Sequence, residues 1–180
     1  IANGFSFCAL TGKKEVMRLG GIKNAGDKKL FLVSTTHGGE TTAIAAGLAT
    51  MDIFENNNVV DYNKKIGQYF IDGVNEIFND QDVKDYFNLK GFNWNVGLIV
   101  KNSKKEPCMF YRTLFMQEMI KRGVLYQGIL SPCYSMTEND IDLMLEAFSD
   151  SVKVFKKALE EGYGKYLIGP EIKPVFRKYN

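Results

Sequence analysis

The residue types that could do chemistry are concentrated between Ser34 and Gly47, in the run STTHGGETTAIAAG. A short apolar run, Leu30 to Val33, leads into it, and an Ala-rich helical pattern leaves it. The first N–H groups of a helix have no partner within the helix and lie at the positive end of its dipole. Such a start, preceded by hydroxyl and glycine residues, can bind a phosphate. The residues alone favour the simpler interpretation, a helix start capped by Thr and Gly.

Neither common nucleotide-binding fingerprint is present. The chain has no G-x-G-x-x-G motif. Its one candidate for a phosphate-binding P-loop, Gly12-Lys13, has Phe7 in place of the first glycine and Lys14 in place of Ser or Thr. A nucleotide site is therefore not predicted from motifs.

Histidine and cysteine usage excludes most metal and nucleophile sites. His37 is the single histidine, so a two-histidine metal site is excluded, and its surroundings favour a polar turn residue over a catalytic base. Cys8, Cys108 and Cys133 form no C-x-x-C pair, which argues against a zinc site or a disulfide framework. We expect no metal, and we expect reduced thiols in a cytoplasmic protein.

The composition is that of a globular protein. The 180 residues are 45% hydrophobic and 24% charged, with a net charge of +2. Scattered basic residues offer no stripe for a nucleic acid, and no apolar run reaches the roughly 20 residues of a membrane span. We expect a soluble protein that binds neither nucleic acid nor membrane. Because the chain opens at Ile1, without Met, and enters an apolar run almost at once, we expect it to begin inside a domain.

The first third of the chain predicts part of an α/β layer. Apolar runs at Phe5 to Leu10 and Leu30 to Val33 are typical of buried strands. Each is followed by a helical pattern, at Lys13 to Leu19 and at Thr41 to Phe54. In the second helix small alanines would let another backbone approach, and three larger residues are expected to fill the core: Ile44, Leu48 and Met51.

The rest of the chain predicts a long helix and a small α+β module at roughly Asp82 to Gly162. The helix runs from about Val59 to Phe78. Alternating apolar residues from Phe92 to Val100 predict a strand with one buried face. The module's helices are expected at Tyr111 to Lys121, with Leu114, Phe115, Met119 and Ile120 inward and Gly123 as cap, and after a capping box at Thr137 to Asp140.

Taken in order, these stretches resemble the C-terminal part of the class III pyridoxal-phosphate-dependent aminotransferases, closest to the glutamate-1-semialdehyde aminomutase-like branch. The resemblance covers nearly the whole chain and depends on four stretches together: Ile1-Ala2-Asn3-Gly4-Phe5, Ser34 to Glu40, Met119 to Val124, and Thr137 to Asp142.

The resemblance implies a fold of type I, α/β and α+β in class. Residues 1–55 would end the large pyridoxal-phosphate-binding α/β domain, 56–81 would be a connecting helix, and 82–180 a small C-terminal α+β domain with an extended tail. The parent protein would be a homodimer with shared active sites, acting on a small-molecule amino donor and acceptor. Thr35 would hold the cofactor phosphate of the neighbouring subunit, with Ser34 contributing backbone contact.

The same resemblance places the chemistry outside this chain. The catalytic Schiff-base lysine would lie just upstream of Ile1, so these 180 residues alone would be inactive. Between Val124 and Thr137 the chain also lacks the gating acid of the aminomutases. That departure makes another amino donor, or a sugar-like or keto compound, an equal alternative to glutamate 1-semialdehyde. A non-catalytic α/β binding or dimerisation module derived from the same fold stays open as the second function.

Overall fold

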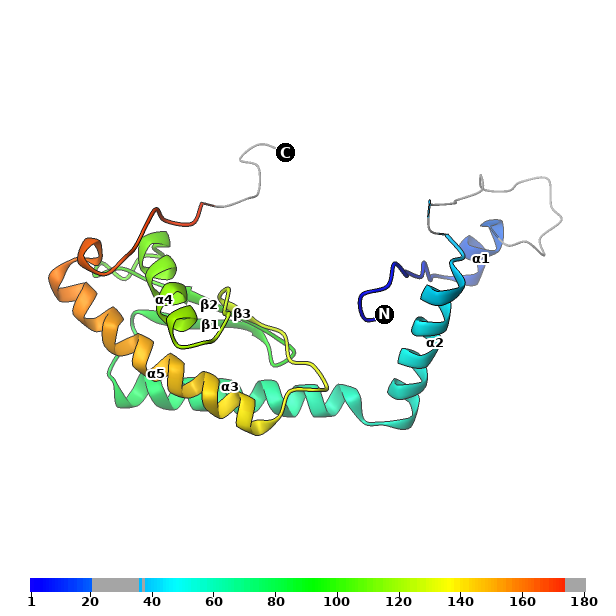
Figure 1. Cartoon of the computed structure of the whole chain (residues 1–180), viewed down its shortest axis with the longest axis horizontal. Coiled ribbons are helices and arrows are strands. Elements are labelled where there is room, and N and C mark those ends of the chain that lie inside the picture. Colours follow the sequence, from blue (N-terminus) through cyan, green and yellow to red (C-terminus); the bar gives the residue numbers. More distant parts are fainter. Residues whose placement is uncertain (21–35, 37, 174–180) are drawn as a thin grey trace. The chain divides into compact units, whose positions relative to one another are not determined.

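The computed structural model describes residues 1–20, 36 and 38–173, and its ribbon is drawn in Figure 1. The chain divides into two compact units, residues 1–59 and 60–180, which are described separately. The domain boundaries expected from the sequence, at 55 and 81, stay a prediction.

In the described part of unit 1, a short helix and a 3₁₀ turn precede the long helix. The short helix α1 (Lys14–Met17) runs into the 3₁₀ turn η1 (Arg18–Gly20), which confirms the helix expected at Lys13 to Leu19. The long helix α2 (Thr41–Asn56) confirms the Ala-rich helix.

The strand expected at Phe5 to Leu10 is wrong, because this segment is irregular and both of these end residues are largely exposed. A strand needs a neighbouring strand for its backbone hydrogen bonds, and the described residues of unit 1 contain none. The second expected strand, Leu30 to Val33, lies outside the described residues.

The packing of α2 is the reverse of the one expected. Ala43 and Gly47 are buried, whereas the large side chains of Ile44, Leu48 and Met51 are exposed in this unit. A Cβ on Gly47 would stand 3.0 Å from the ring of Phe7, so the small residues form the contact face. Small residues allow this close approach, and the expectation that the large ones fill the core of unit 1 was wrong.

The described part of unit 2 combines a three-stranded antiparallel sheet with three helices that share one buried core. Its helices are α3 (Val59–Asp80), α4 (Met109–Lys121) and α5 (Glu138–Glu161), followed by the 3₁₀ turn η2 (Tyr163–Lys165). Its strands are β1 (Phe87–Phe92), β2 (Asn95–Val100) and β3 (Ile129–Leu130), in the order β1-β2-β3.

A two-residue turn, Asn93-Trp94, joins β1 to β2. The register pairs Phe87 with Val100 and Phe92 with Asn95, so the chain reverses inside the run of alternating residues. Val96, Leu98 and Val100 are buried as expected, but Phe92 and Trp94 are exposed at the tip of the hairpin. There the two rings stack, with centroids 4.7 Å apart.

The core of unit 2 is rich in phenylalanine. Phe87 of β1 lies 4.6 Å from Phe155 of α5 between ring centroids, and Phe115 of α4 lies equally close to Phe148. The helices α3 and α5 run side by side (Figure 1), where the Tyr69 hydroxyl donates to the Asp142 carboxylate at 2.7 Å. The helix α5 thereby confirms the helix expected after the capping box.

The start of α5 and the end of α4 are formed by the residues that the sequence predicted. Thr137 and Asp140 form the expected capping box at the start of α5, with the Asp140 N–H donating to Thr137 Oγ1 at 3.2 Å. Gly123 follows α4 with φ of +84°, as a left-handed cap requires. Ile120, expected inward, is exposed instead.

No helix among the described residues is long and apolar enough to cross a membrane. Within the same residues, no group of three or more His, Cys, Asp or Glu side chains is arranged to hold a metal ion.

Candidate functional site

The predicted phosphate turn is only partly described. Ser34, Thr35 and His37 lie outside the described residues, and the proposed roles of Ser34 and Thr35 stay predictions. Thr36, Gly38 and the start of α2 are described. The described part of the candidate site is the start of α2 together with the residues around it.

The start of α2 carries no side-chain cap. Glu40 occupies the N-cap position with an extended backbone, and its side chain makes no capping hydrogen bond. The first N–H with an acceptor in the helix is that of Ile44, which donates to the Glu40 carbonyl at 3.0 Å. The preceding N–H groups, from Thr41 to Ala43, have no acceptor inside the helix. The N-cap residue is thus Glu40 and neither Thr nor Gly, and the N–H groups of the first turn lie at the end of the helix that binds anions.

A small cavity adjoins these donors. It measures about 160 Å³, and residues Ser6 to Cys8 line it opposite Gly38, Gly39, Glu40, Ala43 and Ile44. By the same measure a single water molecule needs roughly 10–15 Å³, so the cavity has room for a phosphate group. The donors and the space therefore fit the phosphate of a cofactor such as pyridoxal phosphate.

Glu40 is the one described carboxylate in this lining. The Thr42 hydroxyl donates to Glu40 Oε1 at 3.1 Å. A carboxylate at a helix N-terminus interacts favourably with the dipole, so Glu40 contributes to the stability of α2. The negative charge of Glu40 also repels a bound phosphate, so it weakens phosphate binding at this helix end to a modest extent.

The cysteines do not form a site. Cys8, Cys108 and Cys133 are all free thiols, with Cys108 partly buried and the other two exposed. Cys8 is part of the cavity lining at α2.

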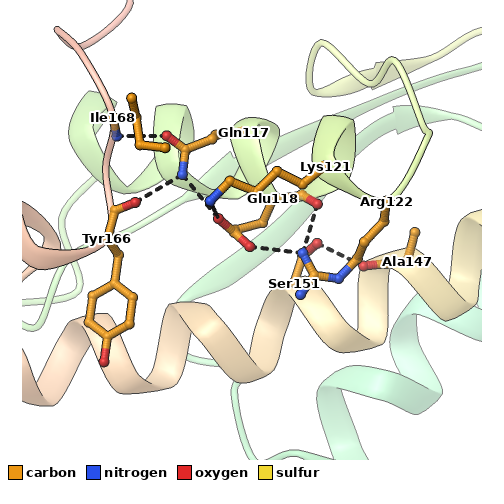
Figure 2. Close-up of polar contacts among 8 residues, drawn as sticks. All are labelled: Gln117, Glu118, Lys121, Arg122, Ala147, Ser151, Tyr166 and Ile168. Atoms are coloured by element: carbon orange, nitrogen blue, oxygen red, sulfur yellow. Dashed lines mark hydrogen bonds and ion pairs between the residues drawn. The ribbon is translucent and has the colours of Figure 1, made fainter.

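A buried carboxylate on α4 was missed by the sequence analysis. Glu118 is only 5% exposed, and it accepts from Lys121 at 2.7 Å, Arg122 at 2.8 Å and Gln117 at 3.0 Å (Figure 2). Burial by itself raises the pKa of Glu118, but these three hydrogen bonds outweigh it, so the pKa lies below its usual value. The side chain is therefore ionised near neutral pH.

The sequence did contain a signal for this cluster. Lys121 and Arg122 stand three and four residues after Glu118, the spacing at which helix side chains meet. What the spacing could not show is that Glu118 is buried, since exposed helices carry the same pattern.

Tyr126 is a second buried polar group. Its hydroxyl has no hydrogen-bond partner among the described residues, and burial raises its pKa, so it stays protonated. Its ring lies 6.3 Å from both Phe70 and Phe148 between centroids. These contacts assign Tyr126 to the core of unit 2.

Comparison with known proteins identifies the family. The sequence model of the Aminotransferase class-III family matches residues 1–152. A 3-aminobutyryl-CoA aminotransferase from Cloacimonas acidaminovorans (strain Evry) is 28% identical over 163 residues, covering 88% of this chain and 37% of the relative. A glutamate-1-semialdehyde 2,1-aminomutase from Methanothrix thermoacetophila is 36% identical over 84 residues, covering 44% of this chain and 17% of the relative.

The chain thus spans well under half the length of the relatives that it matches. The family match covers most of the chain and agrees with the resemblance drawn from the residues. This protein belongs to the class III aminotransferase family.

Proposed function

We propose that the complete protein is a pyridoxal-phosphate-dependent aminotransferase or aminomutase. It moves an amino group between an amino donor and a keto or aldehyde acceptor, through a lysine that lies upstream of Ile1. Family membership over residues 1–152 is the observation that carries the proposal. The two relatives are named for different substrates, and the gating acid is missing, so the proposal stops at this substrate class.

The residues at the start of α2 would hold the phosphate. The bound cofactor supplies an electron sink that lets a proton leave the substrate carbon. Thr35 would donate its hydroxyl and N–H to the phosphate, and Ser34 would add backbone contact. The uncapped helix end and its cavity support this assignment. In a homodimer with shared sites, this phosphate would belong to the cofactor of the neighbouring subunit.

The cofactor is tested on the complete protein. Adding pyridoxal phosphate should produce the visible absorption of a bound cofactor, and an amino donor should then shift that absorption. A complete protein that stays colourless and does not respond to donors would contradict the proposal.

The role of Thr35 is tested by removing its hydroxyl. Thr35→Val should weaken cofactor binding about tenfold or more, because a hydrogen bond to a charged group is worth about 1.5–3 kcal/mol. Cofactor retention on dialysis measures the loss. Thr50→Val is the matched control, since the Thr50 hydroxyl donates to Ala46 O within α2. Loss of binding in Thr36→Val but not in Thr35→Val would transfer the contact to Thr36.

The alternative function is a non-catalytic binding or dimerisation module. It is separated from the enzyme by the residues encoded directly before Ile1. A lysine two residues upstream would exclude the non-catalytic module, whereas a native start codon there would favour it.

A further inference from the structure

The segment after η2 lies against α4. Two of its backbone N–H groups donate hydrogen bonds to side chains of that helix. The Ile168 N–H donates to Gln117 Oε1 at 2.7 Å, and the Ile172 N–H donates to Thr113 Oγ1 at 3.0 Å. Gln117 and Thr113 are four residues apart, so they lie on the same face of the helix. We call residues 168–172 the C-terminal strap.

The side chains of the strap lie outside the core of unit 2. Ile168 is 75% exposed and Ile172 is 40% exposed, and neither belongs to the core of unit 2. Gly169 has φ of +83°, and a Cβ there would meet nothing within 4 Å. The strap is therefore joined to α4 by two hydrogen bonds and contributes no residue to the buried core, unlike the helices of unit 2.

The chain before the strap is anchored in a different way. Tyr163 stacks on Phe110 with ring centroids 4.6 Å apart, and it also meets Tyr111 edge-on at 5.5 Å. Tyr166 and Leu167 pack partly buried against the core of unit 2. The residues directly before the strap are therefore packed against unit 2, whereas the strap itself is joined to α4 by two hydrogen bonds.

The side-chain amide of Gln117 is oriented by hydrogen bonds other than the one to the strap. Its Nε2 donates to Tyr166 O at 2.9 Å and to Glu118 Oε1 at 3.0 Å (Figure 2). Fixing the nitrogen leaves Oε1 directed at the Ile168 N–H. Glu118 in turn is held by Lys121 and Arg122. The ion cluster of α4 therefore positions the residue that holds the strap.

We propose that the C-terminal strap opens and recloses on α4 without unfolding of unit 2, with Gln117 and Thr113 as its latch and Glu118 as the positioning residue for Gln117. The strap lies beyond residue 152, where the family match ends. It is thus a conformational device additional to the proposed phosphate site. Segments held by few buried contacts open locally at a lower free energy than the core.

Hydrogen exchange on the intact protein tests the proposal. In the wild type, the amides of Ile168 and Ile172 should be protected but exchange faster than those of α5. Gln117→Ala should speed exchange at Ile168 at least tenfold and leave α5 unchanged. Gln68→Ala is the matched control, because Gln68 also makes a helix-surface hydrogen bond, to Asp72. Strap amides that exchange at the rate of α5 in the wild type would overturn the proposal.

Variants at two further positions keep the test decisive if Gln117→Ala loosens the whole unit. Thr113→Val should speed exchange at Ile172 alone, and Thr113→Ser should restore it, since serine keeps the acceptor oxygen. For the positioning role, Glu118→Ala should speed exchange at Ile168, whereas Glu118→Gln, which retains an acceptor, should do so less. Equal exchange at Ile168 in wild type, Gln117→Ala and Glu118→Ala would overturn the latch.

Discussion

Glu118 combines burial, ionisation and three hydrogen bonds in one side chain of α4. Because its pKa is lower in the folded than in the unfolded protein, its contribution to stability is present above the unfolded pKa of about 4.3. That contribution is lost as the pH falls through the lower, folded value.

Glu118→Gln should therefore destabilise the protein by about 1–3 kcal/mol at pH 7, the cost of weakening charge-assisted hydrogen bonds. The difference from wild type should shrink as the pH falls below about 4. Urea unfolding at a series of pH values measures this. Glu146→Gln, at an exposed position of α5, is the matched control and should change little. A pH-independent difference would mean that the ionised form is not what stabilises α4.

At the level of elements, the sequence predicted helices better than strands. The helices α3 and α5 are long enough for the 3.6-residue period of their apolar residues to be unambiguous, whereas the shorter α4 was predicted with Ile120 on the wrong face. The strand β1 was missed because the two-residue turn after Phe92 leaves the alternation of apolar residues unbroken while the chain reverses. The alternation of apolar residues therefore continues through the hairpin turn. For this reason Phe92 and Trp94, which are exposed, were predicted to lie on the buried face of one strand.

Two glycines of α3 set the closest approaches of this helix. A Cβ at Gly67 would collide with the backbone carbonyl of Asn93, whereas one at Gly73 would collide with the side chain of Leu145. A backbone carbonyl moves less readily than a leucine side chain. Gly67→Ala should thus destabilise by about 1–3 kcal/mol and Gly73→Ala by less, by the usual cost of overpacking.

Thermal unfolding of the two variants measures this order. Gly164→Ala is the control, since a Cβ there would meet nothing within 4 Å. If Gly73→Ala proved the more destabilising, the contact of α3 with α5 would be tighter than its contact with the hairpin.

At the level of the whole molecule, the two units differ in how far they could be predicted. Unit 2 has a buried aromatic core whose residues all come from within it, so patterns along the sequence sufficed for most of it. In unit 1 the large apolar residues of α2 are exposed and an expected strand is absent. Strands of an α/β layer depend on neighbouring strands, which a local pattern cannot supply. The phosphate residues, Ser34 and Thr35, fall in the part that is not described.

This difference predicts the behaviour of the units in isolation. Residues 60–180 alone should unfold cooperatively, because they contain a complete core, whereas residues 1–59 alone should not. Denaturant unfolding followed by far-UV and near-UV circular dichroism measures both. Loss of cooperativity in 60–180 would show that its core needs residues outside unit 2.

The stacked pair at the hairpin tip has one more consequence. Trp94 is the only tryptophan of the chain, and it is 50% exposed, away from the phenylalanine core. Fluorescence excited selectively at tryptophan, and not at the nine tyrosines, therefore reports on the turn between β1 and β2 and not on the interior. A dissolved quencher reaches this fluorophore in the native state, and any molecule or subunit that covers the tip shields it, which gives the protein a built-in optical probe of association.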